Sequence, residues 1–527
     1  EFQRLYGTGE LLYQSAEKVL NLEKKPSVYA PIGSYKDLLP YLVRRLLENG
    51  ANSSFINRLL DPETDANWLA ENPAIRIEKE KIDIPLPKNI FTERKNSSGF
   101  DLSENSNLEN LEKNISAHKK NKINAESIYM NRDERENVGQ KVYSIANNEE
   151  IGTVIFDDPI NVKSTLENFA SKKWSKYSVQ ERSQILIKIS DDIEKDPNEL
   201  IFYLLNEAGK TIQNAIDEIR EAIDFLRYYS RQIIEIHGKK SLQGPTGEIN
   251  KISYSPKGNY LCISPWNFPV AILIGQISAA LASGNNVVVK PSENTSILGY
   301  LIVKKFHEHG VPIETLQLIL GDGMYGDILT KINTINGVAF TGSLPTAKKI
   351  QTNLIQHHKE IVPLIAETGG INAMIVDSSA LLEQVTDDVV RSAFDSAGQR
   401  CSALRVLCIQ EEIYNELIEM IKGNMEIQEI GDPNNFSTDI GPIINKHALQ
   451  KLNDYIKGCK EQGMEVYNCN NSLKETHMAP TIIEIDNISA IQEEQFGPIL
   501  HVMKYKFDDM NGVINQINES GYGLTMG

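Results

Sequence analysis

The sequence predicts an α/β protein built on a parallel sheet that helices cover on both faces. From about residue 250, short apolar runs alternate with helical patterns, so residues 285–289, 316–320 and 337–340 are predicted strands and residues 297–306 a helix. Strand–helix alternation implies right-handed crossovers, and such sheets bind ligands at the carboxyl ends of their strands. Residues 160–235 are predicted to be strongly helical, with apolar side chains at helical spacing at Ile185, Leu186, Ile189, Leu200, Leu204 and Leu205.

Two further regions precede this pattern. Residues 1–72 carry helical patterning, and residues 73–140 change in character. The stretch from residue 93 to 122 is rich in Asn, Ser, Lys and Glu, and such a composition buries too little apolar surface to offset its ordering entropy. We therefore predict a linker or exposed arm, partly flexible, over residues 73–140.

Charge and composition exclude several classes of function. The chain has 527 residues and a net charge of −17, which disfavours binding to nucleic acid and to anionic membranes. No segment reaches the ~18 apolar residues of a membrane span, and residues 270–282, interrupted by Gly275, Gln276 and Ser278, are predicted to form a buried helix. The five cysteines include no Cys-x-x-Cys pair. That usage indicates a reducing cytoplasm and neither a disulfide framework nor a metal site.

Cys401 is the candidate nucleophile. It lies in the run GQRCS at 398–402, whose flanks are small and polar and include Arg400. An accessible thiol beside a cation favours the reactive thiolate, although a lone cysteine is more often a small buried hydrophobe. Cys262 and Cys408, by contrast, lie in apolar strand-like runs.

Two polar residues could assist such a nucleophile. Glu367 follows an apolar run and precedes two glycines in AETGG at 366–370, a plausible place for a general base or, alternatively, a surface turn residue. Asn267 lies in PWNFP at 265–269, where two prolines and two aromatic residues fix the loop. Its amide could donate to an oxyanion or simply cap the helix that follows.

Nucleotide-binding signals occur at two strand ends. Lys290 and Glu293, in KPSE at 290–293, could bind ribose hydroxyls and favour NAD over NADP, or could be an exposed pair. FTGS at 340–343 ends a strand and begins a helix, which favours a bound phosphate. Residues 321–326 match G-x-G-x-x-G but lack the acidic residue expected about 20 positions later, so they are predicted to be a loop and a helix start.

Together with EQFGP at 494–498, these runs resemble the aldehyde dehydrogenase superfamily, in whose order and approximate spacing they occur over about residues 150–527. The resemblance implies an aldehyde dehydrogenase fold, with a Rossmann-like NAD domain at 141–364 and an α/β catalytic domain at 365–527. It implies that Cys401 attacks the aldehyde, that Asn267 and the Cys401 N–H hold the oxyanion, and that Glu367 activates water. The residues it assigns to NAD are Trp266, Lys290, Ser292, Glu293, Thr341, Gly342, Ser343, Glu494 and Phe496.

Finer matches around Cys401 and Glu367 resemble the glutamate-semialdehyde (pyrroline-5-carboxylate) dehydrogenase branch, which implies that Ser402 and Phe268 contact the substrate. Residues 1–7, 29–33 and 41–52 resemble the end of the proline dehydrogenase barrel in the bifunctional proline utilization A family, which also uses FAD. That resemblance matches Tyr29, Tyr41, Arg44 and Arg45 to a proline-binding pocket, although a solvated helix face is the alternative for the arginines.

Both ends of the sequence are expected to be truncated. Residues 1–72 would be the remnant of a (β/α)₈ barrel that cannot close alone, so we expect proline oxidation and FAD binding from an intact parent protein and not from this chain. Beyond Gly527 the family continues with a loop that anchors the substrate carboxylate and a segment used in homodimers. An aldehyde dehydrogenase of other specificity, and a fragment that binds NAD without turnover, remain the alternatives.

Overall fold

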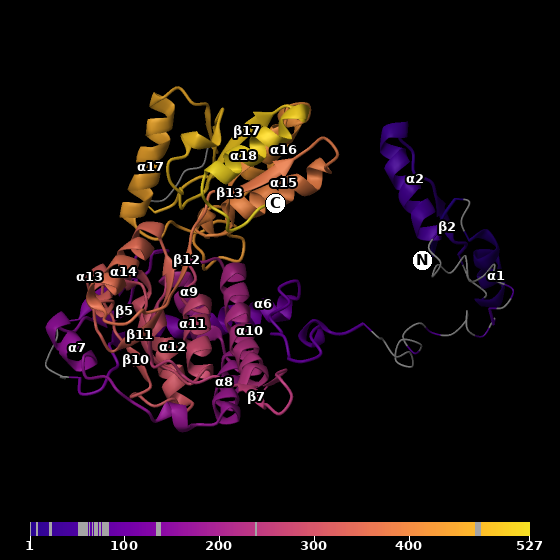
Figure 1. The fold of residues 1–527 in the computed structure, drawn as a ribbon. Coiled ribbons are helices and arrows are strands. Elements are labelled where there is room, and N and C mark those ends of the chain that lie inside the picture. Colours follow the sequence, from indigo (N-terminus) through magenta and orange to yellow (C-terminus); the bar gives the residue numbers. More distant parts are fainter. Residues whose placement is uncertain are drawn as a thin grey trace. The chain divides into compact units, whose positions relative to one another are not determined.

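The computed structural model describes residues 2–6, 9–20, 24–50, positions 62, 64, 65, 67, 72 and 75, and residues 84–132, 139–237, 240–469 and 476–527. The chain forms two compact units, Glu1–Pro85 and Leu86–Gly527 (Figure 1). Each unit is described by itself below.

The first unit contains a parallel strand pair and two helices. Its elements in order are β1 (Gln3–Leu5), α1 (Glu10–Leu20), β2 (Ser27–Tyr29) and α2 (Tyr35–Gly50), and β1 pairs with β2 in parallel. Strand–helix alternation with parallel pairing is the repeating unit of a (β/α)₈ barrel. The helical patterning predicted in residues 1–72 is therefore confirmed over α1 and α2, whereas Ala51 and Asn52 lie outside the described residues.

The second unit is organised around two sheets. The first sheet is parallel, in the order β10-β9-β8-β11-β12. Its strands are β8 (Asn259–Ile263), β9 (Asn286–Lys290), β10 (Leu316–Leu318), β11 (Ile335–Gly342) and β12 (Leu364–Thr368). The chain leaves β8 toward β9 and later returns to its other side as β11, so the strand order reverses between β8 and β11.

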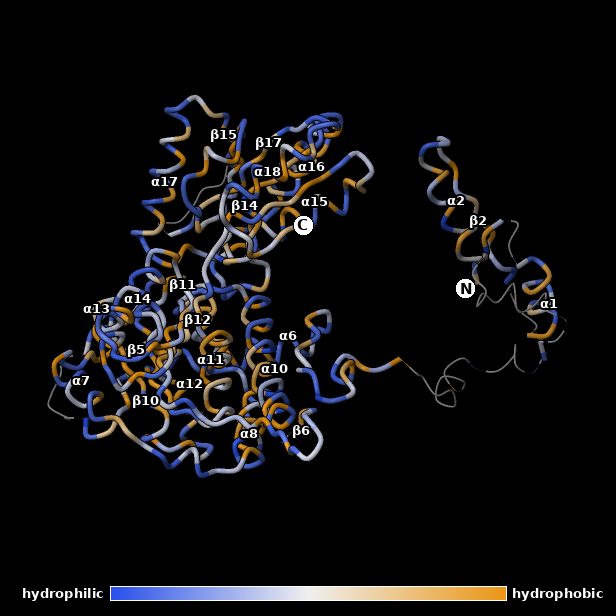
Figure 2. The backbone as a smooth tube through the Cα atoms, in the orientation of Figure 1, coloured by the Kyte–Doolittle hydropathy of each residue, from blue (hydrophilic) through white to orange (hydrophobic). Residues whose placement is uncertain are grey.

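Helices cover both faces of this sheet, as the alternation of side chains along β9 shows. Val287 and Val289 belong to the apolar core that includes the helices before and after β8, whereas Val288 belongs to a separate core on the opposite face. Figure 2 shows hydrophobic residues concentrated along α11 and its neighbours. The first face carries α8 (Val179–Lys195), α9 (Asn198–Asn206), α10 (Ile212–His237), α11 (Ala271–Ala282) and α12 (Ser296–Glu308); the second carries α7 (Pro159–Leu166), α13 (Gly323–Leu329) and α14 (Leu344–His357).

The second sheet has the order β13-β14-β17-β16-β15 and is parallel except for its last pair. It has its own apolar core. Its strands are β13 (Asn372–Val376), β14 (Leu404–Gln410), β15 (Val466–Asn468), β16 (Thr481–Glu484) and β17 (Ile499–Tyr505), and its helices are α15 (Leu382–Phe394), α16 (Tyr414–Glu426), α17 (Lys446–Glu461) and α18 (Met510–Glu519). Cys401 lies between α15 and β14, three residues before β14, which pairs with β13 and β17.

Part of the stretch predicted as a linker or arm, residues 73–140, is folded in the structure. α6 (Asn105–Ala117) forms within the polar stretch because Leu111 and Ile115, four residues apart, are buried on one face. A three-stranded sheet follows, in the order β3-β5-β4, from β3 (Ile123–Glu126), β4 (Gln140–Tyr143) and β5 (Glu150–Ile155). A hairpin of β6 (Lys240–Leu242) and β7 (Asn250–Ile252) precedes β8.

The predicted strands and helices beyond residue 250 are confirmed in type and position, since β9, β10, β11, α11 and α12 overlap the expected residues, although β10 ends at Leu318. The predicted domain boundary at 364/365 falls inside β12, which pairs with β11 in the first sheet. Residues 365–368 therefore belong structurally to the sheet that precedes them. Among the described residues no helix is long and apolar enough to cross a membrane.

Candidate active site

A cavity of about 340 Å³ opens at the carboxyl ends of β8, β9 and β11, where the strand order reverses. Parallel α/β sheets bind their ligands at this position. The predicted cofactor residues that line the cavity are Trp266, Lys290, Ser292, Glu293, Thr341, Gly342 and Ser343.

The helix ends around the first sheet differ in how their N–H groups are satisfied. Buried Glu207 accepts from the Ile297 and Leu298 N–H groups of α12, and buried Glu218 accepts from the Val270 and Ala271 N–H groups at the start of α11. Asp322 caps α13. α14 instead begins at the neutral side chain of Ser343. Because a helix N-terminus attracts an anion unless an acidic side chain already accepts its N–H groups, the start of α14 is the place for a phosphate.

The cavity has the chemistry that a dinucleotide needs. The Ser264 hydroxyl on its wall is buried without a hydrogen-bond partner among the described residues, which leaves it available to a ligand. A Cβ on Gly342 would lie 2.6 Å from the Phe340 ring, so glycine keeps the approach to α14 open. Lys290 Nζ lies 3.5 Å from a Glu293 oxygen, and burial lowers the pKa of Lys290 while Glu293 opposes that change.

Trp266 connects this cavity to the remaining two predicted cofactor residues. Its ring meets Phe496 edge to face, with 5.5 Å between centroids. Glu494, two residues earlier, accepts from Arg405 at 3.1 Å and lies against Gly369, where a Cβ would meet its carboxylate at 1.8 Å. Burial raises the pKa of Glu494, and the Arg405 guanidinium opposes that rise. Glu494 and Phe496 thus lie beside the cavity but not among its lining residues.

A second cavity, of about 320 Å³, contains Cys401. The predicted substrate residues Ser402 and Phe268 line it, and the others are Asn214, Asp217, Glu218, Glu221, Ile272 and Arg400. Cys401 is half-buried. Burial raises the pKa of its thiol and the Glu494 charge adds to that, whereas backbone N–H groups of Ser402 and Cys401 and the Arg405 charge lower it.

The loop that carries Asn267 is fixed by its neighbours. Asn267 is 8% exposed and its amide makes no hydrogen bond to any described residue, but Asn267 is not among the residues that line either cavity. The capping alternative does not hold, because Glu218 accepts the N–H groups at the start of α11. The Phe268 ring lies 4.0 Å from Lys210 Nζ and 5.8 Å from the Arg400 guanidinium, which places two cations against it.

Glu367 lies apart from this cavity. It is exposed on the edge strand β12, paired in register with Thr341, and is not among the residues that line the Cys401 cavity. Its assignment as general base stays a prediction.

In the first unit, Tyr41 and Arg44 lie three residues apart on α2 and therefore share a face of the helix. Tyr29 is half-exposed at the end of β2. The side chain of Arg45 lies outside the described residues. The proline-site assignment of these four residues also stays a prediction.

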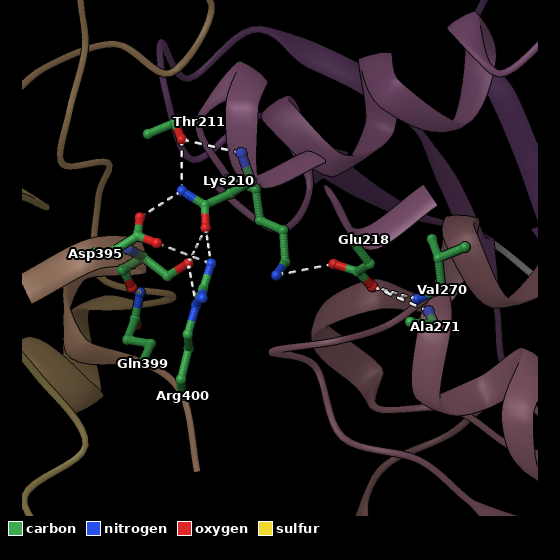
Figure 3. A network of polar contacts seen from close by, with 10 residues as sticks. Lys210, Thr211, Glu218, Val270, Ala271, Asp395, Gln399 and Arg400 are labelled. Carbon is green, nitrogen blue, oxygen red and sulfur yellow. Dashed lines mark hydrogen bonds and ion pairs between the residues drawn. The ribbon is translucent and has the colours of Figure 1, made fainter. Parts of the chain in front are cut away.

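Sequence reasoning missed the polar side chains that hold the Cys401 cavity together. Lys210 and Glu218 form a buried ion pair at 2.8 Å (Figure 3). Buried Arg405 donates to the Gly398, Arg400 and Gly497 carbonyls, and so ties the Cys401 segment to the Glu494 loop. The available signal was a set of charged residues that lie on the apolar side of a predicted helix or strand. Among the described residues no cluster could hold a metal ion.

Comparison with known proteins agrees with this arrangement. A family model described as the aldehyde dehydrogenase family matches residues 131–527, and one described as proline dehydrogenase matches residues 1–58. The bifunctional protein PutA of Klebsiella aerogenes is 40% identical over 556 residues, covering 100% of this chain and 41% of that protein. The chain thus spans less than half the length of this bifunctional relative.

Two further relatives cover part of the chain. The 1-pyrroline-5-carboxylate dehydrogenase of Geobacillus kaustophilus is 33% identical over 363 residues, which cover 68% of this chain and 70% of that protein. A crystal structure of 1-pyrroline-5-carboxylate dehydrogenase from Thermus with bound NAD is similar, with a TM-score of 0.76 and 28% identity, and covers 82% of this chain and 86% of that chain.

Proposed function

The chain belongs to the aldehyde dehydrogenase family, and on that premise we propose that it oxidises L-glutamate γ-semialdehyde, the open form of pyrroline-5-carboxylate, to glutamate with NAD. The observation that carries the proposal is the cavity that brings Cys401 together with Ser402, Phe268 and Arg400. The Ser402 hydroxyl beside the thiol suits an aldehyde that also bears a carboxylate, because it can donate a hydrogen bond to that group.

Each residue has a defined task in this reaction. The Cys401 thiolate attacks the aldehyde carbon, and the Asn267 amide with the Cys401 N–H holds the oxygen as it becomes negative. Bound NAD supplies the nicotinamide that accepts hydride from this carbon. Glu367 then takes a proton from the water that hydrolyses the Cys401 thioester, and glutamate leaves.

The first cavity suits the cofactor. Lys290 and Glu293 would bind the adenosine ribose, and the start of α14 at Ser343 would bind the pyrophosphate. Trp266, Ser292, Thr341 and Gly342 would line the path, and Glu494 with Phe496 would orient the nicotinamide end. Glu293 would repel a 2′-phosphate, which favours NAD over NADP.

The first unit supports a proposal about the longer protein. The proline dehydrogenase match at residues 1–58 is consistent with a parent that also oxidises proline with FAD, with Tyr29, Tyr41, Arg44 and Arg45 at its proline site. We further propose that this parent is a cytoplasmic homodimer.

The test is NADH formation from NAD and glutamate semialdehyde, beside Cys401→Ala and a panel of other aldehydes. The proposal would be supported if the unsubstituted chain formed NADH, the Cys401→Ala variant formed none, and the semialdehyde were preferred over the other aldehydes. Faster turnover of an aldehyde without a carboxylate would favour another specificity. NAD binding with no NADH from any aldehyde would mean that the chain binds its cofactor without turnover.

A further inference from the structure

The N-terminal end of α10 and the residues just before it contact both halves of the catalytic centre. Residues between Lys210 and Glu218 hydrogen-bond on one side to the segment that precedes Cys401, and on the other side to the backbone that follows Asn267 (Figure 3). One rigid element therefore connects the nucleophile to the oxyanion donor, although the two are 134 positions apart in the chain, at 267 and 401.

The segment before Cys401 has a conformation that needs external support. Ser396 and Ala397 have positive φ angles, 55° and 54°, and Gly398 follows at 64°. Residues with a Cβ rarely adopt this left-handed region, and such residues persist only where the surroundings hold them. Cys401 lies three residues after this run, so whatever holds the run also places the thiol.

Asn214 supplies that support with every hydrogen-bonding group of its side chain. Its Nδ2 donates to Asp395 Oδ1 at 2.6 Å and to Thr211 Oγ1 at 2.7 Å. Its Oδ1 accepts from the Ser396 hydroxyl at 2.6 Å and from the Arg400 guanidinium. Asn214 is 4% exposed, and an amide has two donor hydrogens and two acceptor lone pairs, so all four are used and its orientation is fixed.

The same element holds the Asn267 loop through Glu218. Its Oε1 accepts from the Val270 and Ala271 N–H groups at 2.7 and 3.2 Å, and its Oε2 pairs with Lys210 Nζ at 2.8 Å. Both side chains are at most 5% exposed. The exit of the loop is thereby fixed three residues after Asn267.

We propose that Asn214 is a positioning residue, which holds the Cys401 thiol at the correct distance from the Asn267 amide through the start of α10. The inference rests on the proposed roles of Cys401 as nucleophile and Asn267 as oxyanion donor. It assigns to Asn214 no contact with the reacting atoms.

Two reactions of Cys401 that need neither NAD nor the semialdehyde separate positioning from thiol reactivity. With p-nitrophenyl acetate the thiolate attacks the ester carbonyl, p-nitrophenolate leaves and an acetyl thioester forms, a reaction assisted by an oxyanion donor. With iodoacetamide the thiolate displaces iodide and no oxyanion forms. Cys401→Ala must abolish both signals, which shows that they report on this cysteine among the five.

We expect Asn214→Ala to lower the acylation rate about tenfold or more, because small misplacements of reacting groups cost this much. The alkylation rate should change by less than about twofold, since it needs the thiolate alone. A parallel fall of both rates would show that Asn214 affects thiol reactivity rather than placement. An unchanged acylation rate would overturn the inference as well.

A rescue pair guards against a variant that merely unfolds. Asn214→Asp replaces the amide that donates to Asp395 with a second carboxylate, so it should lower the acylation rate. The double variant Asn214→Asp with Asp395→Asn exchanges the donor and the acceptor of this hydrogen bond. It should therefore recover most of the lost acylation rate. Failure of the double variant to recover, with its melting temperature intact, would count against the proposal. The matched control is Asn206→Asp, a buried amide that bonds to Asn434 without touching the Cys401 segment, and it should leave acylation unchanged.

Discussion

The two cavities of the second unit are built in different ways. The cofactor cavity is lined by residues at the ends of neighbouring strands, where a short run such as 340–343 supplies both the strand end and the helix start. The Cys401 cavity is assembled from α10, the Asn267 loop and the segment after α15, and it depends on buried polar contacts between them. Short sequence runs therefore supply most of the first cavity, whereas the second cavity forms only when segments far apart in the chain pack together.

The largest expected effect comes from Glu218→Ala, which breaks the contact between α10 and the Asn267 loop. The variant leaves Lys210 buried without its partner and two N–H groups without an acceptor, and breaking a buried pair in this way costs about 3–5 kcal/mol. Denaturant titration should show that loss in the free energy of unfolding. A loss below about 1 kcal/mol, the scale of an exposed pair, would mean that the pair does not hold this cavity together.

Glu207→Gln is the matched comparison, because Glu207 also caps a helix of the first sheet. Burial raises the pKa of Glu207 to about 8 from 4.5. A carboxyl with a raised pKa contributes stability that is present below about pH 4.5 and is lost as the pH rises toward 8. Between pH 4.5 and 8 we expect the free energy of unfolding of the unsubstituted chain to fall relative to that of the Glu207→Gln variant. A difference that does not change with pH would contradict this.

Asn267→Ala should affect chemistry without affecting the cofactor. Removing one oxyanion donor costs about 100-fold to 1000-fold in turnover. Calorimetry should give the same affinity for NAD as in the parent chain. A weaker affinity for NAD would show that the two cavities are not separable at this loop.

Lys290→Met tests the first cavity, as Asn267→Ala tests the catalytic loop. It removes a buried ammonium from the cofactor cavity while keeping a side chain of similar length, and we expect about a tenfold loss of NAD affinity. Alkylation of Cys401 in the absence of NAD should proceed at the parental rate. A change in that rate would indicate long-range coupling between the cavities.

Glu494→Gln should have the smallest effect, because burial contributes more than the Glu494 charge to the raised pKa of Cys401. That charge adds to the burial that raises the pKa of Cys401, so removing the charge lowers that pKa and increases the thiolate fraction at neutral pH. We expect alkylation at pH 8 to become faster, because a larger fraction of Cys401 is then present as the thiolate. A slower reaction would show that the Glu494 charge does not raise the pKa of Cys401.

The difference between the cavities also explains what the sequence could predict. β9, β11 and the start of α14 follow from apolar runs and turn residues, so the residues predicted to bind the cofactor could be placed at the ends of their strands from the sequence. Asn214, Glu218 and Arg405 escaped prediction because a charged or amide residue in a helix or strand normally faces solvent. A polar residue on the apolar side of a helix or strand is a signal of burial, but the partners lie far away in the chain, so the sequence does not show which groups it contacts. α6 was missed for a similar reason, since its buried positions, Leu111 and Ile115, lie in a polar stretch.

The placement of Trp266 gives the protein an optical probe of its own. The chain has three tryptophans, of which Trp68 lies outside the described residues and Trp174 is fully buried, with its indole N–H bonded to the Leu281 carbonyl. Trp266 lines the cofactor cavity against Phe496. Emission from Trp174 should stay constant while that of Trp266 is quenched as the cavity fills. Replacing Trp266 with phenylalanine should remove the quenching, so occupancy could be followed by fluorescence without any added label.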